Sequence, residues 1–142
     1  MIILLDTNVV LDILLCRHPW YTNAALIFGL AQQNLIKGYV SASTITDIFY
    51  IAQKEHGKDT AREAIKRLLR VFYPATVTDK NIYQALELEW NDFEDSVQFA
   101  VGEALSADFI VTRDTRDFAS GSIAAVTPEQ FIQTIADITE ND

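Results

Sequence analysis

Cysteine is almost absent from this chain of 142 residues, in which Cys16 stands alone. A single cysteine cannot form an internal disulfide, and such scarcity is typical of proteins from a reducing cytoplasm. Cys16 lies in an apolar segment with no histidine at the spacing of a catalytic pair, so we expect a small buried side chain. The sequence also lacks an apolar run long enough to cross a bilayer and the basic start of a signal peptide. We therefore predict a cytoplasmic protein.

Basic residues are scarce as well. The chain has 11 Lys and Arg against 20 Asp and Glu, which gives a net charge of −9. This balance argues against a general surface for binding nucleic acid. It still allows nucleic acid as a substrate, because a metal ion held by clustered acids can bridge to phosphate. A basic protein partner would also suit the charge.

Six of the eleven basic residues are concentrated between positions 54 and 70. Most of them recur at four-residue spacing on the polar face of an amphipathic helix that we predict at 59–72. Such a face is either an ordinary solvated surface or a ridge that follows the phosphates of a nucleic acid. On the second interpretation, Lys54, Lys58 and Arg62 would steer the phosphate backbone of the nucleic acid.

Glycine and proline are few, five and three, and they fall at breaks between apolar patterns. No internal repeat or linker is visible, so we expect one domain over residues 1–136 and a polar tail at 137–142. Strands joined by helical crossovers imply a mainly parallel sheet covered on both faces. The predicted fold class is α/β, a three-layer α/β/α sandwich with four or five short strands.

Apolar periodicity and capping residues place the individual elements. The strands are expected at 2–5, 39–41, 75–77, 109–112 and 123–126. The helices are expected at 9–15, 21–36, 44–55, 59–72, 79–90, 93–105 and from 128 onward.

Asp6 follows directly on the four apolar residues of the first predicted strand. An unpaired carboxylate cannot lie deep in a sheet that is buried on both faces. We therefore place Asp6 at the carboxyl end of the strand, where open α/β sheets bind their ligands. Asp6 or Thr7 is equally suited to cap a helix that begins near Val9. The other acids bear on the choice between a cap and a site.

Acids occur at three further places. Asp114 and Asp117 follow the fourth predicted strand as Asp6 follows the first, which is harder to explain by capping alone. Asp95 stands in the first turn of a predicted helix, where the helix dipole favours an acid and from where it can face the sheet edge. Asp47 lies early in another helix and either completes a capping pattern or joins the other acids.

Our central hypothesis is that these acids converge on one cation. Carboxylates a few ångströms apart repel one another, and their pKa values rise unless a cation neutralises them. Oxygen ligands without Cys or His favour Mg²⁺ or Mn²⁺ over zinc. Such an ion lowers the pKa of bound water and holds phosphate oxygens, which makes phosphodiester hydrolysis the natural reaction. The two histidines, His18 and His56, have no partner at metal-binding spacing.

Two blocks of sequence resemble the PIN-domain family. The first is Leu4–Asp12, LLDTNVVLD, and the second combines Phe93–Gln98, FEDSVQ, with Phe109–Phe118, FIVTRDTRDF. The blocks lie in the family's order, and the resemblance extends from about Ile2 to Phe131. The chain is most similar to compact prokaryotic PIN proteins, many of which are VapC-like toxins of type II toxin–antitoxin pairs.

The resemblance implies an α/β/α fold, Mg²⁺- or Mn²⁺-dependent ribonuclease activity, frequent homodimers and often an antitoxin that covers the site. The family's first and third acids map to Asp6 and Asp95, and its fourth to Asp114 or Asp117. The second acid, usually Glu, falls on Asp47, which is one methylene shorter. The resulting catalytic set is Asp6, Asp47, Asp95, Asp114 and Asp117, with Asp6, Asp95 and Asp114 or Asp117 as metal ligands.

Thr7, Asn8 and Thr112 are the positions expected to orient these carboxylates. The expected substrate is RNA, single-stranded or structured. Two alternatives stay open. A phosphatase with Asp6 as nucleophile would typically carry a second Asp where this chain has Asn8. A non-catalytic PIN-like binding or regulatory module would accommodate the departure at Asp47.

Overall fold

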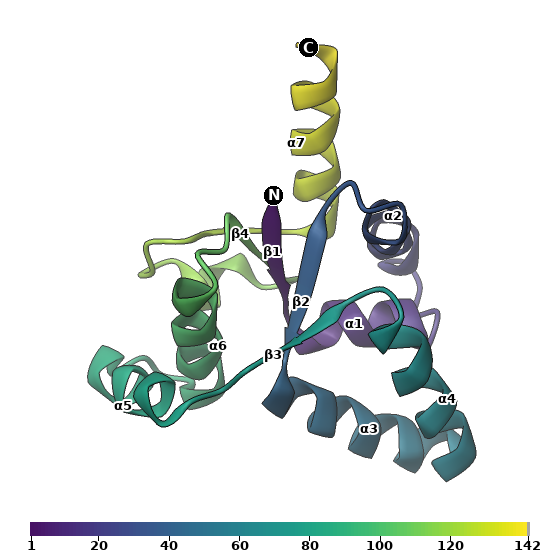
Figure 1. Cartoon of the computed structure of the whole chain (residues 1–142), viewed down its shortest axis with the longest axis horizontal. Coiled ribbons are helices and arrows are strands. Elements are labelled where there is room, and N and C mark those ends of the chain that lie inside the picture. The colour runs from purple at the N-terminus through teal and green to yellow at the C-terminus, as the bar shows by residue number, and fades with distance from the viewer. Residues whose placement is uncertain (142) are drawn as a thin grey trace.

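The computed structural model describes residues 1–141, which form a central sheet covered by helices (Figure 1). The strands are β1 (Ile2–Leu5), β2 (Lys37–Ser41), β3 (Tyr73–Ala75), β4 (Phe109–Val111) and β5 (Ala124–Val126). The helices are α1 (Thr7–Leu14), α2 (Tyr21–Gln32), α3 (Ala42–His56), α4 (Lys58–Leu69), α5 (Asp79–Leu88), α6 (Phe93–Ala104), the 3₁₀ helix η1 (Thr115–Phe118) and α7 (Pro128–Glu140).

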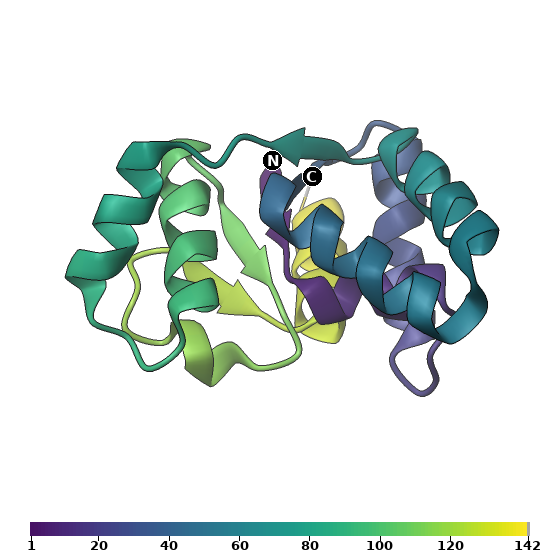
Figure 2. The same cartoon turned by 90° about the horizontal axis from the view of Figure 1, so that it is seen from below.

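The sheet has the strand order β3-β2-β1-β4-β5, and all four pairs of neighbouring strands are parallel. Successive residues of β1 point to opposite faces. Ile3 and Leu5 join a core formed with α1–α4 and α7, whereas Leu4 joins a core formed with α5, α6 and η1. Figure 2 shows the α3–α4 pair and the α5–α6 pair on opposite sides of the molecule. The predicted α/β/α sandwich with a parallel sheet is confirmed.

The chain changes direction across the sheet between β1 and β4. From β1 it proceeds to β2 and β3 through helices on one face, and from β4 it proceeds to β5 through η1 on the other. The connections that leave the carboxyl ends of β1 and β4 therefore diverge. In parallel sheets such a divergence opens a crevice at the strand ends, which is where ligands bind.

Several element boundaries differ from the sequence prediction, and in two of them pairing in the sheet outweighs local pattern. The helix predicted to Ile36 ends at Gln32, since Asn34 adopts a left-handed conformation and the Lys37 N–H donates to the Met1 carbonyl beside β1. Pro74 lies within β3 rather than before it. A proline is tolerated there because β3 is an edge strand, paired only with β2.

Apolar periodicity places Leu35 and Leu86 on the inward faces of their predicted helices, but both side chains are exposed. Leu35 is 63% exposed because it follows the end of α2, and Leu86 is 59% exposed because α5 packs mainly against α6. Cys16, predicted as a small buried side chain, is also exposed, and it has a positive φ of 51° in the turn after α1. Helical spacing alone did not distinguish the covered stripe of α5 from its outer face.

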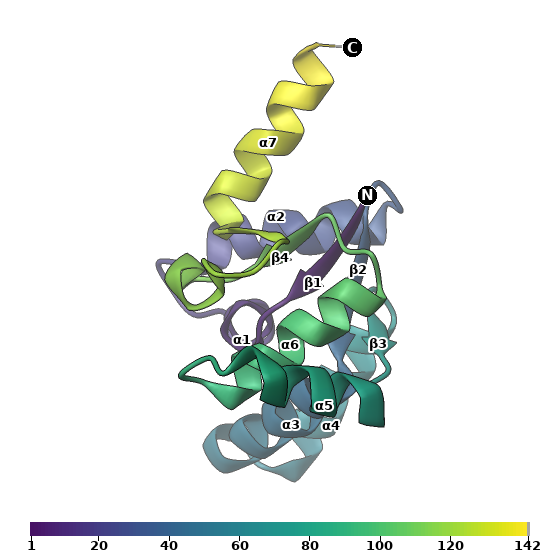
Figure 3. The same ribbon diagram turned by 90° about the vertical axis from the view of Figure 1, so that its left-hand side faces the viewer.

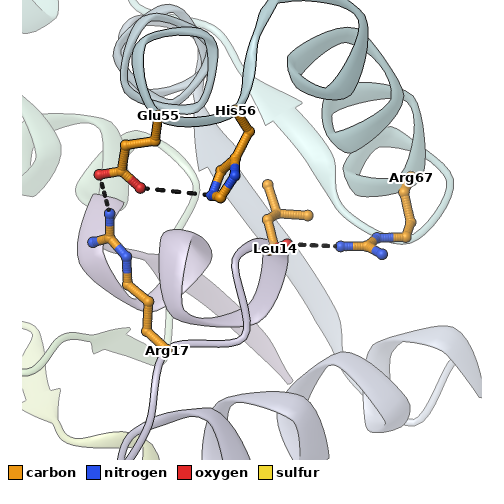
Figure 4. A network of polar contacts seen from close by, with 5 residues as sticks. All are labelled: Leu14, Arg17, Glu55, His56 and Arg67. Carbon is orange, nitrogen blue, oxygen red and sulfur yellow. Dashed lines mark hydrogen bonds and ion pairs between the residues drawn. The ribbon is translucent and has the colours of Figure 1, made fainter.

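Polar contacts fasten the α3–α4 hairpin to the end of α1 (Figure 4). Arg67 donates a hydrogen bond of 3.1 Å to the Leu14 carbonyl, and Arg17 forms an ion pair of 3.0 Å with Glu55. Glu55 also lies 3.8 Å from the imidazole of His56. Arg67 is therefore a structural member of the basic segment rather than a free phosphate ligand.

The last helix, α7, starts with a capping box in which the Thr127 hydroxyl accepts from the Gln130 N–H and the Gln130 side chain accepts from the Thr127 N–H. Its first turns pack against α2, and its end projects away from the rest of the molecule (Figure 3). Residues 137–140, expected to begin a polar tail, continue this helix, and residue 142 of that tail lies outside the described residues. Over residues 1–141, no helix combines the length and apolar character needed to cross a membrane.

Close packing at Gly38 gives a test of the core. A Cβ atom at this position in β2 would lie 2.5 Å from a ring carbon of buried Phe72, whereas one at Gly29 in α2 would meet nothing within 4 Å. We expect Gly38→Ala to lower the free energy of unfolding by about 1–3 kcal/mol through overpacking. The control, Gly29→Ala, should raise it by up to about 1 kcal/mol, because alanine favours a helix. Urea denaturation measures both, and equal stability of the two variants would contradict this packing.

Candidate active site

A cavity of about 720 Å³ opens at the carboxyl ends of β1 and β4. Its walls are dominated by carboxylates from three separate stretches of the chain. The acids that line it are Asp6, Asp92, Glu94, Asp95, Asp114 and Asp117. Two arginines, Arg113 and Arg116, share the wall. The cavity is thus strongly negative at its centre, with positive charge supplied from one side.

Asp6 both caps a helix and lines the cavity. The helix cap and the site, which were alternatives in the sequence, are therefore both present. The Oδ1 of Asp6 accepts hydrogen bonds from the Thr7 N–H at 2.8 Å and from Gln98 Nε2 at 2.7 Å. Its Oδ2 accepts from the Thr112 hydroxyl at 2.8 Å. These donors belong to α1, α6 and the end of β4, and they fix the orientation of the carboxylate.

Asp95 lines the same cavity from the first turn of α6, and only 9% of the residue is exposed. The turn is held by Asp92, whose carboxylate accepts from the Asp95 N–H at 3.1 Å. Burial, and after it the nearby charges of Asp92, Asp6 and Asp117, together raise the pKa of Asp95 to about 7. Near neutral pH, this carboxyl therefore sits between its protonated and ionised forms.

Glu94 lines the cavity beside Asp95, although only Asp95 of this pair was assigned to the catalytic set from the sequence. Glu94 accepts a hydrogen bond of 3.3 Å from the Thr7 hydroxyl at the edge of the cavity. Its pKa is raised first by burial and then by the negative charge of Asp47, while the bond from Thr7 opposes the rise. Its position directly before Asp95 in the same helical turn was the available signal.

Asp114 and Asp117 have different surroundings, which bears on which of them faces a metal. Asp114 Oδ1 accepts from the Arg116 N–H at 3.3 Å and so caps η1. The pKa of Asp117 is raised by desolvation and then by Asp114, and Asp117 in turn raises the pKa of Asp95. Asp117 is therefore the acid of this pair whose charge acts on the pKa of Asp95.

Asp47 does not line the cavity. It lies exposed on α3, and its charge reaches the site only through its effect on the pKa of Glu94. The short side chain of Asp keeps its carboxylate close to α3.

The residues expected to orient the acids have separate roles. Thr112 and Thr7 donate to Asp6 and Glu94, whereas Asn8 lines the cavity without a side-chain hydrogen bond to any described residue. Gln98 supplies the contact that the sequence analysis missed. It lies one turn after Asp95 on α6, so the i, i+3 spacing could have indicated it.

The predicted RNA-binding residues Lys54, Lys58 and Arg62 lie exposed around the α3–α4 junction and do not line the cavity. The cations beside the acids are Arg113 and Arg116 instead. Both follow β4, within the block TRDTRDF.

Comparison with known proteins agrees with this architecture. The sequence profile of the PIN domain matches residues 2–116, most of the chain. The chain belongs to the PIN-domain family. No curated protein matches the chain as a whole or in part. The resemblance to this family, predicted from the two sequence blocks, is confirmed.

Several solved structures share the fold of this PIN domain. VapBC2 from Rickettsia felis, bound to promoter DNA, gives a TM-score of 0.71 at 17% identity and covers 89% of this chain and 97% of its own. VapC20 from Mycobacterium tuberculosis, a toxin that cleaves the sarcin–ricin loop, gives 0.68 at 18% identity and covers 84% and 95%. A toxin–antitoxin complex from Klebsiella pneumoniae gives 0.66 at 22% identity and covers 88% and 96%.

The donor set of the PIN-domain cavity fits a hard divalent cation, although residues 1–141 contain no group of three acidic, His or Cys side chains already arranged as a metal site. Carboxylate oxygens are the ligands that Mg²⁺ and Mn²⁺ prefer. The raised pKa values of Asp95, Glu94 and Asp117 show mutual repulsion and desolvation that a cation would offset.

The raised pKa of Asp95 predicts a pH-dependent cost in stability. The folded state holds this proton up to about pH 7, whereas an ordinary Asp loses it near 3.8, so stability falls as pH rises through this window. With metal chelated, we expect Asp95→Asn to raise the free energy of unfolding at pH 8 by about 1–3 kcal/mol.

The gain should shrink as pH falls from 8 toward 4, because both forms are then uncharged at this position. Glu103→Gln, at the other end of α6 and outside the cavity, is the matched control and should give a small, pH-independent change. Thermal melts at several pH values measure this difference. An Asp95→Asn variant that is less stable than wild type at pH 8 would show that the carboxylate is not repelled.

Proposed function

We propose that this PIN-domain protein is a Mg²⁺- or Mn²⁺-dependent endoribonuclease that hydrolyses phosphodiester bonds in RNA. The observation that carries the proposal is the convergence of Asp6, Glu94, Asp95 and Asp117 in one open cavity at the carboxyl edge of the sheet. Such a cluster, with pKa values raised by burial and repulsion, favours binding of a hard cation. The similar VapC20, a toxin that cleaves the sarcin–ricin loop, supports RNA as the substrate.

Asp6, Asp95 and Asp117 are the residues that would hold the ion. When bound, the ion would polarise the phosphate and lower the pKa of a water molecule. Gln98 and Thr112 keep the Asp6 carboxylate in one orientation, and Asp114 places Asp117 by capping η1.

Two further groups would act on the substrate. The guanidinium groups of Arg113 and Arg116 lie in the wall of the cavity and would bind phosphate oxygens of RNA. Glu94 has a raised pKa and only a weak bond from Thr7, so its carboxylate is suited to accept a proton from the attacking water. Lys54, Lys58 and Arg62 would contribute longer-range attraction for the RNA backbone.

We further propose that the chain is the toxin of a type II toxin–antitoxin pair, acts in the cytoplasm and forms a homodimer. The similar structures from Rickettsia felis and Klebsiella pneumoniae are toxin–antitoxin assemblies, which supports an antitoxin partner. A net charge of −9 suits a partner with a basic segment that covers the acidic cavity.

Cleavage of RNA tests the proposed reaction. We expect wild-type protein to cut single-stranded RNA in Mg²⁺ or Mn²⁺ and to lose this activity in EDTA. Asp6→Asn should reduce cleavage by more than about 100-fold, beyond the usual effect of losing a group that only orients a ligand. Glu103→Gln, an acid of α6 outside the cavity, should cleave like wild type.

Cleavage that survives both EDTA and Asp6→Asn would contradict the proposal. The placement of Asp47 outside the cavity keeps a second candidate, a non-catalytic PIN-like module. That module would cut no RNA under any of these conditions, and millimolar Mn²⁺ would not raise its melting temperature. A metal-binding enzyme must be stabilised by its ion through mass action.

A further inference from the structure

A second cavity, of about 340 Å³, adjoins the acidic cavity across Arg113, which lines both. Its other walls come from the turn before α2, from α2 itself and from the start of α7. The lining includes Trp20, Asn23, Pro128 and Glu129. The cavity carries one cation and one acid, so it is close to neutral, in contrast with the acidic cavity beside it.

Trp20 is the largest side chain in this second cavity. It is 44% exposed, whereas Phe72 and Phe131 in the core of the protein are buried. The guanidinium carbon of Arg113 lies 3.8 Å from the centroid of its ring, so one face of the indole is stacked against a cation. Since 44% of the residue is exposed, part of the Trp20 side chain is accessible.

A buried ion pair fixes Arg113 between the two cavities. Its Nε lies 3.2 Å from Oδ2 of Asp12, a residue of α1 that is completely buried. Burial raises the pKa of Asp12, and the charge of Arg113 opposes the rise. A buried carboxylate is costly unless it has a partner, so the pair holds the guanidinium in place at the boundary.

On the basis of the proposed ribonuclease function, we propose that the second cavity binds one nucleobase of the RNA beside the phosphate that is cut. Arg113 would contact the phosphate, and the adjacent base would stack on the accessible part of Trp20. The Asn23 amide and the Glu129 carboxylate offer a donor and acceptors for the edge of the base.

The chemistry of the cavity favours a base over other occupants. A second phosphate would meet the charge of Glu129, and a purely apolar side chain would offer no partner to the Asn23 amide. A flat, neutral ring with polar edges satisfies both the indole and the polar groups. The volume is at the lower end of the range for small-molecule pockets, about 300–1,000 Å³, which suits a single base.

Binding of fluorescently labelled single-stranded RNA to the Asp6→Asn protein in Mg²⁺ tests this site separately from cleavage. Adding Trp20→Ala should weaken binding about tenfold, within the range measured for loss of one stacked base. Adding Trp20→Phe should keep affinity within about threefold, because a ring remains. Tyr83→Ala removes an exposed aromatic side chain of α5 outside both cavities and should change nothing.

The possible outcomes separate the two proposals. Equal affinities of Asp6→Asn and its Trp20→Ala derivative, or no RNA binding at all, would overturn the base pocket, and so would equal losses in the Ala and Phe variants. A protein segment as the natural occupant would also leave the RNA affinities equal.

Failure of otherwise wild-type protein to cleave RNA would refute the ribonuclease proposal, while the binding comparison would still decide the pocket. In the cleaving protein, Trp20→Ala should raise KM about tenfold and leave kcat within about twofold.

Discussion

The hydrogen bonds to Asp6 are the interaction on which the site depends. Gln98 and Thr112 are separated from Asp6 by 92 and 106 residues in sequence, yet both donate to its carboxylate. They connect the end of β1 with the end of β4 and with α6, and the other acids of the cavity lie at or beside the latter two segments. The parallel pairing of β1 with β4 makes these contacts geometrically possible, because it brings both carboxyl ends to one edge. Changes in the sheet register would separate the acids.

The cost of this arrangement is electrostatic repulsion. Asp95 is held in a buried turn beside other acids, and its pKa is raised to about 7 as a result. Two features limit the cost. Hydrogen-bond donors satisfy Asp6, and the capping roles of Asp92 and Asp114 place negative charge at helix starts, where it is favoured. The remaining repulsion between the carboxylates favours binding of a cation.

Much of this arrangement could be predicted from the sequence. The apolar run before Asp6 and the matching run before Asp114 indicated two buried strands with acids at their ends, and the parallel sheet followed from the helical crossovers. Asp95 could be placed by its position in the first helical turn. The predictions of the strands and of the parallel sheet are confirmed, because local pattern and sheet geometry agree there.

Other features depend on contacts between distant segments and could not be predicted from local pattern. The donor role of Gln98 requires that α6 pack with this face toward β1, and the ion pair of Asp12 with Arg113 joins α1 to the segment after β4. The clustered basic residues of α4 indicated a surface for nucleic acid, whereas Arg113 and Arg116 are the cations that line the cavity. Exposure of Leu35 and Leu86 depends on where α2 ends and on which helix covers α5.

The most direct test of the central claim, that these acids form one cation site, is the anomalous diffraction of a crystal soaked in Mn²⁺. The account predicts an anomalous peak in the cavity at the ends of β1 and β4, within coordination distance of oxygens from Asp95, Asp117 and Asp6. A fully soaked crystal with no manganese between these carboxylates, or with the ion bound only elsewhere on the protein, would contradict it.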